Sequence, residues 1–81
     1  MPSFAVRFKG MLFKNQRARL SAAGIELVSS EPAMQIGSIK TGEPINTVTL
    51  EADSEEQAIA TVKQKLSPDD VNFSGWEAES A

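Results

Sequence analysis

Several residue types on which much protein chemistry depends are missing from this chain of 81 residues. It has no cysteine, which excludes disulfides, thiolate nucleophiles and zinc ligation through sulfur. It has no histidine, the commonest general base and metal ligand, and it has no tyrosine. These absences favour a non-catalytic protein over an enzyme, and we predict no catalytic residue, no metal site and no cofactor.

Long apolar runs are missing as well. No stretch approaches the roughly 18 apolar residues that a membrane span requires, and the N-terminus lacks the basic-then-apolar order of a signal peptide. We therefore expect a cytoplasmic chain that does not engage a membrane. Hydrophobic residues make up 41% of the sequence and are spread along it, which is typical of a folded chain. The length is that of one small domain.

Hydrophobic patterns predict six secondary-structure elements. Residues 3–9 alternate apolar and polar side chains, as a half-buried strand does. Ser54-Glu55-Glu56-Gln57 forms a capping box at the start of a helix, which Pro68 prevents from continuing. The predicted elements are strands 3–9, 25–30, 45–51 and 72–79, helices 13–23 and 54–66, and a long connection or hairpin arm over 31–44.

Two local features refine these predictions. The helix over 13–23 has a thin apolar stripe, in which we expect Phe13, Gln16, Leu20 and Ala23 to face the core. In the last strand, Phe73 and Trp76 can both face the core only if a bulge at Ser74-Gly75 shifts the alternation.

The order strand, helix, strand, strand, helix, strand predicts an α+β fold over residues 1–81. We expect a ferredoxin-like βαββαβ sandwich, with a four-stranded antiparallel sheet in the order 4-1-3-2 and both helices on one face. Proteins with unrelated functions share this architecture, so the fold alone does not identify the function.

Charge is distributed unevenly along the chain. Residues 1–25 contain five basic side chains and no acid, although the net charge of the whole chain is −3. In the expected sheet, Arg7 and Lys9 share the open face with Glu77 and Glu79, and such cross-strand pairs contribute about 0.2–1 kcal/mol each. We therefore expect the fold to balance much of this charge internally.

Nucleic-acid binding is not expected. RNA-recognition domains place aromatic side chains on the outward faces of the first and third strands. Here the sequence provides small, charged and threonine residues at those positions, and its pI is about 4.8.

Our first functional hypothesis is a small non-catalytic interaction or regulatory module. It would bind a protein partner, or associate with itself as a homodimer, through its sheet face, an edge strand or the 31–44 segment. The threonine-rich open face and the length of that segment support this hypothesis. The predicted interaction surface comprises Arg7, Thr47, Thr49, Glu51, Met34 and Ile36.

The alternative hypothesis is a domain that binds a small anion or metabolite. The end of the first strand, the 31–44 segment and the turn around Pro68 should meet at one rim, beside the amides that open the first helix. A helix start beside a glycine and lysines suits a phosphate or carboxylate. The predicted ligand-binding residues are Lys9, Gly10, Lys14 and Lys40.

A third hypothesis is a hydrolase. The stretch Arg7-Phe8-Lys9-Gly10 followed by Phe13-Lys14 resembles the phosphate-cradling loop of acylphosphatases. In that family the loop has a second glycine and a closing arginine, and an asparagine lies on the next strand. Here Lys14 replaces the arginine and residues 25–30 contain no asparagine, which disfavours this activity.

Overall fold

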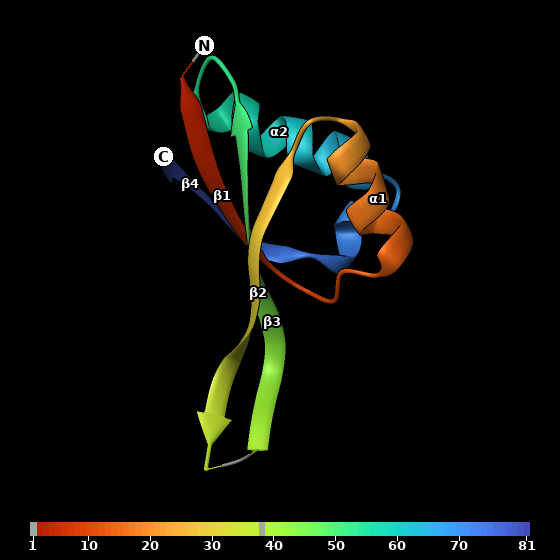
Figure 1. Cartoon of the computed structure of the whole chain (residues 1–81), viewed down its shortest axis with the longest axis vertical. Helices are drawn as coiled ribbons and strands as arrows, with labels where there is room; N and C mark the ends of the chain where they lie inside the picture. The colour runs from red at the N-terminus through yellow and green to blue at the C-terminus, as the bar shows by residue number, and fades with distance from the viewer. Residues whose placement is uncertain (1, 38) are drawn as a thin grey trace.

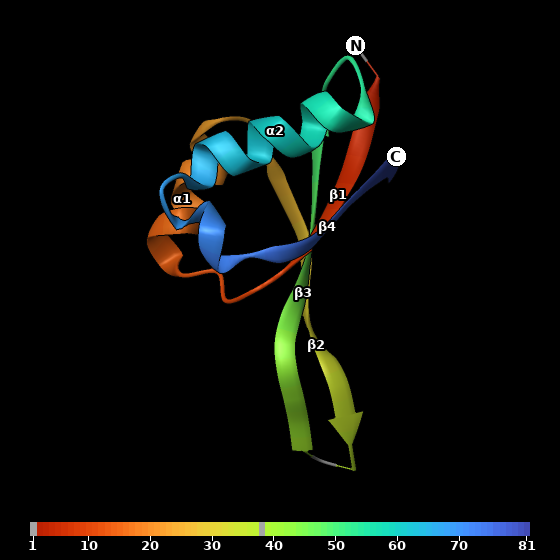
Figure 2. The same cartoon turned by 180° about the vertical axis from the view of Figure 1, so that it is seen from behind.

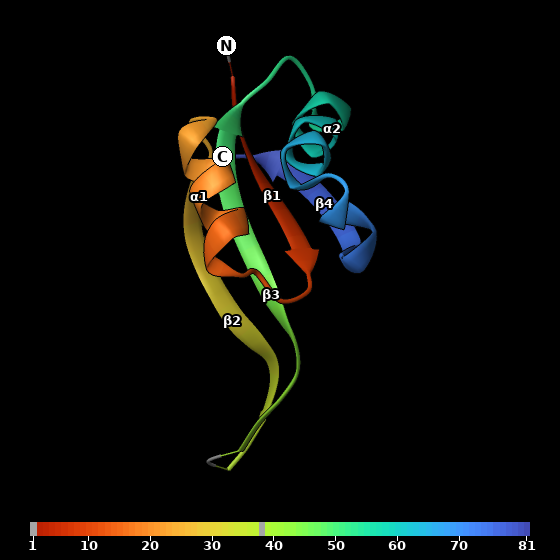
Figure 3. The same ribbon diagram turned by 90° about the vertical axis from the view of Figure 1, so that its right-hand side faces the viewer.

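The chain folds into an antiparallel sheet with two helices on one face, as Figure 3 shows. This computed structural model describes residues 2–37 and 39–81, with side chains for all of these except residues 32–36 and 39–42. The sheet order is β2-β3-β1-β4, which is the predicted order read from the opposite edge, so the predicted ferredoxin-like fold class is confirmed. The elements are β1 (Ser3–Lys9), α1 (Lys14–Ala22), β2 (Glu26–Ile36), β3 (Ile39–Glu51), α2 (Glu55–Leu66), the 3₁₀ helix η1 (Asp69–Asn72) and β4 (Ser74–Ser80).

The core lies between the sheet and the two helices. The alternation of β1 buries Phe4, Val6 and Phe8 on the helix side. Phe8 is completely buried, and its ring lies edge-on to Phe73 at 5.2 Å between centroids and stacks on Trp76 at 4.6 Å. Other buried apolar residues of the core are Leu12, Leu20, Ile25, Val48, Leu50, Ala52, Ala58, Val62 and Leu66.

A bulge in β4 brings both aromatic residues of the C-terminal region to the core. Arg7 of β1 lies opposite Glu77, but Lys9 lies opposite Ser74, so β4 has one extra residue in this interval. Gly75 provides the bulge with a φ of +67°, a conformation that favours glycine. The predicted bulge at this position is therefore present, and β4 begins after η1 at Ser74 instead of at residue 72.

The two helices differ in how they are fixed. At the start of α2, the Ser54 hydroxyl accepts a hydrogen bond from the Gln57 N–H at 3.1 Å, as the sequence predicts. The shorter α1 buries Gln16 and Leu20. Phe13 precedes this helix with 61% of its surface exposed, and Ala23, which follows the helix, is also exposed, so the predicted places of these two residues in the buried stripe are wrong.

The strands β2 and β3 continue well beyond the rest of the sheet, as Figures 1 and 2 show. The segment predicted as a long connection or a hairpin arm is a hairpin, in which Pro32 lies opposite Pro44 and Ile36 lies opposite Ile39. The chain reverses direction at Gly37, whose φ is +59°. We call residues 32–44 the arm and the remainder of the chain the body. With the arm, the molecule measures 41 × 25 × 18 Å.

Neither described helix is long and apolar enough to cross a membrane.

Candidate functional site

The arm leaves the body at a rim where three other segments meet. These are the end of β1, the segment that leads into α1, and η1, which lie close together in Figure 1. The Gly10 N–H donates to the Pro44 carbonyl at 3.0 Å, just beyond the last β1–β3 pair, Lys9 with Ile45. Gly10 adopts a φ of +146°, and a Cβ at this position would lie 2.3 Å from Cδ1 of Phe73. The close packing of this rim therefore requires glycine.

A buried amide side chain holds the base of the arm to the body. Asn46 of β3 is completely buried, and its Nδ2 donates to the carbonyls of Gly10 at 2.9 Å and Phe8 at 3.3 Å. Its Oδ1 accepts a hydrogen bond from the Ser30 hydroxyl of β2 at 2.6 Å. One side chain thus connects β1, β2 and β3 at the point where the arm begins.

A second buried amide fixes the start of α1. The Gln16 Oε1 accepts from the Phe13 N–H at 2.8 Å, and the Gln16 Nε2 donates to the Asp69 carboxylate at 3.2 Å. Because phenylalanine has no side-chain acceptor, Gln16 caps this helix from within. The same side chain ties α1 to η1 and so completes the rim.

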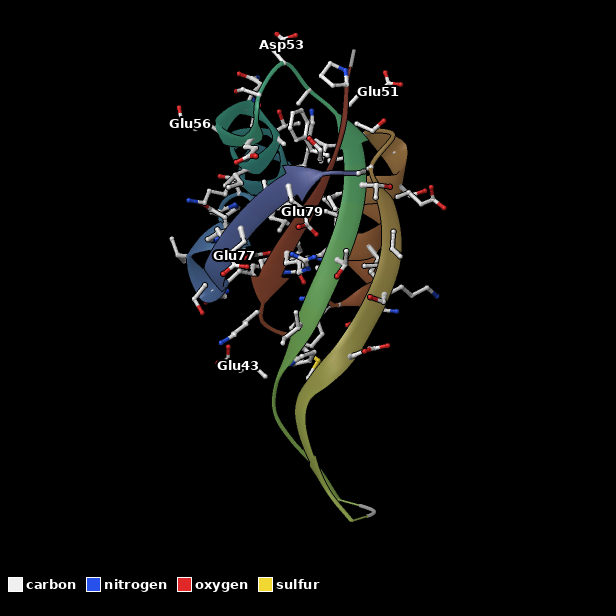
Figure 4. All side chains as sticks on the ribbon, turned by 90° about the vertical axis from the view of Figure 1, so that its left-hand side faces the viewer. Glu43, Glu51, Asp53, Glu56, Glu77 and Glu79 are labelled. Atoms are coloured by element: carbon white, nitrogen blue, oxygen red, sulfur yellow. The ribbon has the colours of Figure 1, made fainter. Side chains whose placement is uncertain are left out.

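The rim encloses a cavity of about 350 Å³ beside the base of the arm. Two of its apolar side chains are exposed, Met11 by 58% and Phe13 by 61%. The label in Figure 4 places Glu43 at the base of the arm, where it also borders this cavity. The lining residues are Gly10, Met11, Phe13, Gln16, Glu43, Pro44 and Asn72.

The described lysines of the predicted anion site lie in different places. Lys9 faces the open side of the sheet, where it borders a cavity of about 250 Å³ with Arg7 and Glu77. Gly10 lines the rim cavity instead, and Lys14 is exposed on the first turn of α1. The side chain of Lys40 lies outside the described residues. The anion site stays a prediction, and the acidic groups at the rim do not favour it.

The open face of the sheet carries the described part of the predicted interaction surface. Arg7, Thr47 and Thr49 are half-buried on this face, and Glu51 is exposed at its upper end in Figure 4. Arg7 forms an ion pair with Glu79, which is one of the two carboxylates expected beside it. The side chains of Met34 and Ile36 in the arm lie outside the described residues.

The sequence did not reveal the role of three residues at or beside the rim, although it placed Gln16 correctly on the buried stripe of the first helix. Asn46 lies two residues before Val48 and four before Leu50, so strand alternation points its side chain into the core with theirs. A polar residue at such an inward position was the sequence signal that could have revealed it. Gln16 also occupies a buried position, but helix periodicity does not reveal its two hydrogen-bond partners. Phe13 belongs to the exposed rim because the helix begins only at Lys14, so Phe13 has an extended backbone and does not follow the helical stripe.

Neither a metal site nor similarity to a known protein identifies the function of this chain. Among the described residues, no three aspartate and glutamate side chains lie close enough to share a metal ion. In comparisons with known proteins, no family model, curated protein or solved structure matches this chain.

Proposed function

We propose that this protein is a non-catalytic interaction module that binds another polypeptide through its arm. The observation that carries this proposal is the length of the hairpin relative to its support. In the described part of the chain, the pairing of β1 with β3 ends at Lys9 opposite Ile45, while β3 extends outward to Ile39. From there to the tip, the arm is a ribbon of two strands.

A ribbon of two strands has two edges at which further strands can pair. Isolated hairpins are marginally stable in water, and a third strand both satisfies their outer backbone groups and buries their side chains. Addition of a strand to such an edge is a common mode of peptide recognition, in which the main chain supplies much of the affinity. The arm therefore offers a binding element that the body does not need for its own core.

Buried hydrogen bonds hold the base of the arm in a fixed orientation. The Asn46 side chain is completely buried and bonded to both β1 and β2, so it fixes the direction in which the arm leaves the body. A binding element that is already oriented loses less conformational freedom when a partner arrives. The buried amide thus supports recognition by a positioned arm.

The same amide argues against hydrolysis by an acylphosphatase-like mechanism. In the structure the Asn46 Nδ2 donates to two backbone carbonyls, those of Phe8 and Gly10. Both amide protons are therefore used within the protein and are not presented to a substrate. Gln16 is likewise occupied by Phe13 and Asp69.

A cytoplasmic location is part of the proposal and rests on the sequence alone. A chain without cysteine forms no disulfides, so its fold is compatible with the reducing cytosol.

The proposal is tested with a shortened variant in which Asn-Gly replaces residues 32–44. Asn-Gly suits a two-residue hairpin turn and leaves the pair Glu31–Ile45 in register. We expect the shortened variant to keep the fold, by amide NMR, and to lose at least tenfold in affinity for any polypeptide that the full chain binds, itself included. Equal affinity of both proteins for the same partner would contradict the proposal and direct attention to the sheet face.

A further inference from the structure

We infer that the polypeptide bound by the arm is a second copy of this chain, and that the tip of each arm docks on the rim cavity of the other copy. The two arms would run antiparallel and pair through the edge of β3. This inference rests on the proposed function, because it names the partner for the same arm.

The rim cavity lies at the base of the arm, where the tip of an antiparallel arm from a second copy can reach it. Pro44 borders the cavity and is also the residue at which the arm begins. From there to the tip, about six strand residues span about 20 Å. When two arms of equal length lie antiparallel, the tip of each necessarily reaches the base of the other. The contact is then the same on both copies and closes as a twofold dimer.

The edge of β3 suits this pairing because it lies on the side of the rim. The sheet order β2-β3-β1-β4 places β1 beside β3, and the described β1–β3 pairing ends at Lys9 opposite Ile45. Beyond that pair, the Gly10 N–H donates to the Pro44 carbonyl, so the β3 edge of the arm starts at the rim cavity. The edge of β2 is the outer edge of the sheet, away from β1.

The chemistry of tip and rim is complementary. Residues 32–42 contain three large apolar residues, a single lysine and no acid. The rim presents the exposed side chains of Met11 and Phe13 beside a cavity of about 350 Å³. Its charged groups include the carboxylates of Glu43 and Asp69. A segment whose sequence holds large apolar residues, one lysine and no acid therefore suits a rim with exposed apolar side chains and carboxylates beside them.

The first test measures self-association by sedimentation velocity over a concentration series. We expect a monomer–dimer equilibrium, and we expect Phe13→Asp to weaken the dimer at least tenfold while its NMR spectrum stays that of the folded body. The matched control is Val28→Asp, which changes a side chain of similar exposure, 58%, in the body part of β2. A dimer broken by Val28→Asp and kept by Phe13→Asp would overturn the inference.

The second test locates the tip directly and does not depend on a rim variant. Since the chain has no cysteine, Gln35→Cys provides a unique position for a nitroxide spin label in the arm. This labelled copy, without isotope, is mixed with ¹⁵N-labelled wild-type protein. We expect signal loss at the amides of residues 10–14 of the isotope-labelled copy. Signal loss at residues 26–30 instead would show pairing through β2 and would overturn the inference.

Failure of this inference can be told apart from failure of the proposed function. A strictly monomeric chain at millimolar concentration overturns the inference alone, because a different polypeptide can still bind the arm. If the full chain and the shortened variant also bind such a polypeptide equally well, the proposed function fails too.

Discussion

The body and the arm of this protein are built from the same sheet but are held together in different ways. In the body, β1 and β3 place Phe8 and Val48 under two helices, where both side chains are completely buried. In the arm, β2 and β3 continue past the helices and pair with each other. Apolar burial therefore stabilises the body, whereas hydrogen bonds of the ladder define the arm.

Under the proposed function, this difference would separate stability from binding within one small domain. Hydrophobic burial is the dominant favourable contribution to folding, so the body should contain nearly all of the protein's stability. In the proposed complex, the arm would contribute the backbone groups of its outer edge, which a partner strand would cover. Asn46 lies at the boundary between the two regions. Its side chain is buried in the body, and its hydrogen bond to Ser30 joins the two strands that continue into the arm. Substitutions in these three places should therefore differ strongly in their effects.

The largest effect is expected in the centre of the body. Phe8→Ala removes a completely buried ring that contacts both Phe73 and Trp76, and such truncations cost about 3–5 kcal/mol. Urea denaturation measures the change. Phe13→Ala is the matched control, since the same residue type is exposed there and the change should stay within about 0.5 kcal/mol. Similar losses for both variants would contradict the position of the core.

The next largest effect is expected at the rim. Gly10→Ala introduces a Cβ beside the ring of Phe73 in addition to backbone strain. Gly24→Ala separates the two causes, because Gly24 has a φ of +78° but no described atom within 4 Å of the added Cβ. We expect Gly24→Ala to cost about 1–2 kcal/mol and Gly10→Ala about 1–3 kcal/mol more. Equal costs, by the same denaturation measurement, would show that the ring of Phe73 moves aside freely.

An intermediate effect is expected where body and arm meet. Asn46→Leu keeps a side chain of similar size but removes the donor to the carbonyls of Phe8 and Gly10. Leaving buried polar groups without partners costs about 1–3 kcal/mol, measured by urea denaturation. Thr47→Val, one residue along β3 and on its open face, should change the stability by no more than about 0.5 kcal/mol. Faster amide exchange at Ser30 in the Leu variant would further show that Asn46 secures the arm.

A smaller effect is expected at the start of α2. Ser54→Ala removes the acceptor for the Gln57 N–H and should reduce the free energy of unfolding by about 0.5–2 kcal/mol. Ser54→Asp provides the control, because aspartate caps a helix as well as serine does. Thermal unfolding of both variants measures the difference, and an equal loss in both would mean that the cap is not the cause.

The fold was predictable because its main signals are local. The alternation of β1, the N-cap at Ser54 and the glycine of the β4 bulge each depend on neighbouring residues, and each is found where the sequence indicates. The strand predicted over 25–30 is shorter than β2, which continues to Ile36. Its length was underestimated because the arm has turn-forming residues at many positions, including Pro32, and such residues also fit a two-stranded ribbon.

The candidate site was less predictable because it depends on contacts between distant residues. Gln16 and Asp69 are 53 positions apart, and Asn46 and Gly10 are 36 positions apart, yet each pair is joined by a hydrogen bond. No periodic pattern encodes such pairs. The rim was expected from topology, whereas its apolar character depends on the exposed side chains of Met11 and Phe13, and Phe13 is exposed because α1 begins one residue later than predicted.

The central claim is that the body folds without the arm, and one measurement tests it most directly. The shortened variant, with Asn-Gly in place of residues 32–44, is compared with the full chain by urea denaturation at a concentration where both are monomeric. We predict that the free energies of unfolding agree within about 0.5 kcal/mol, since the apolar core is untouched and a shorter loop costs less entropy to close. A loss of more than about 2 kcal/mol would contradict the account, because the arm would then be part of the folded core's support.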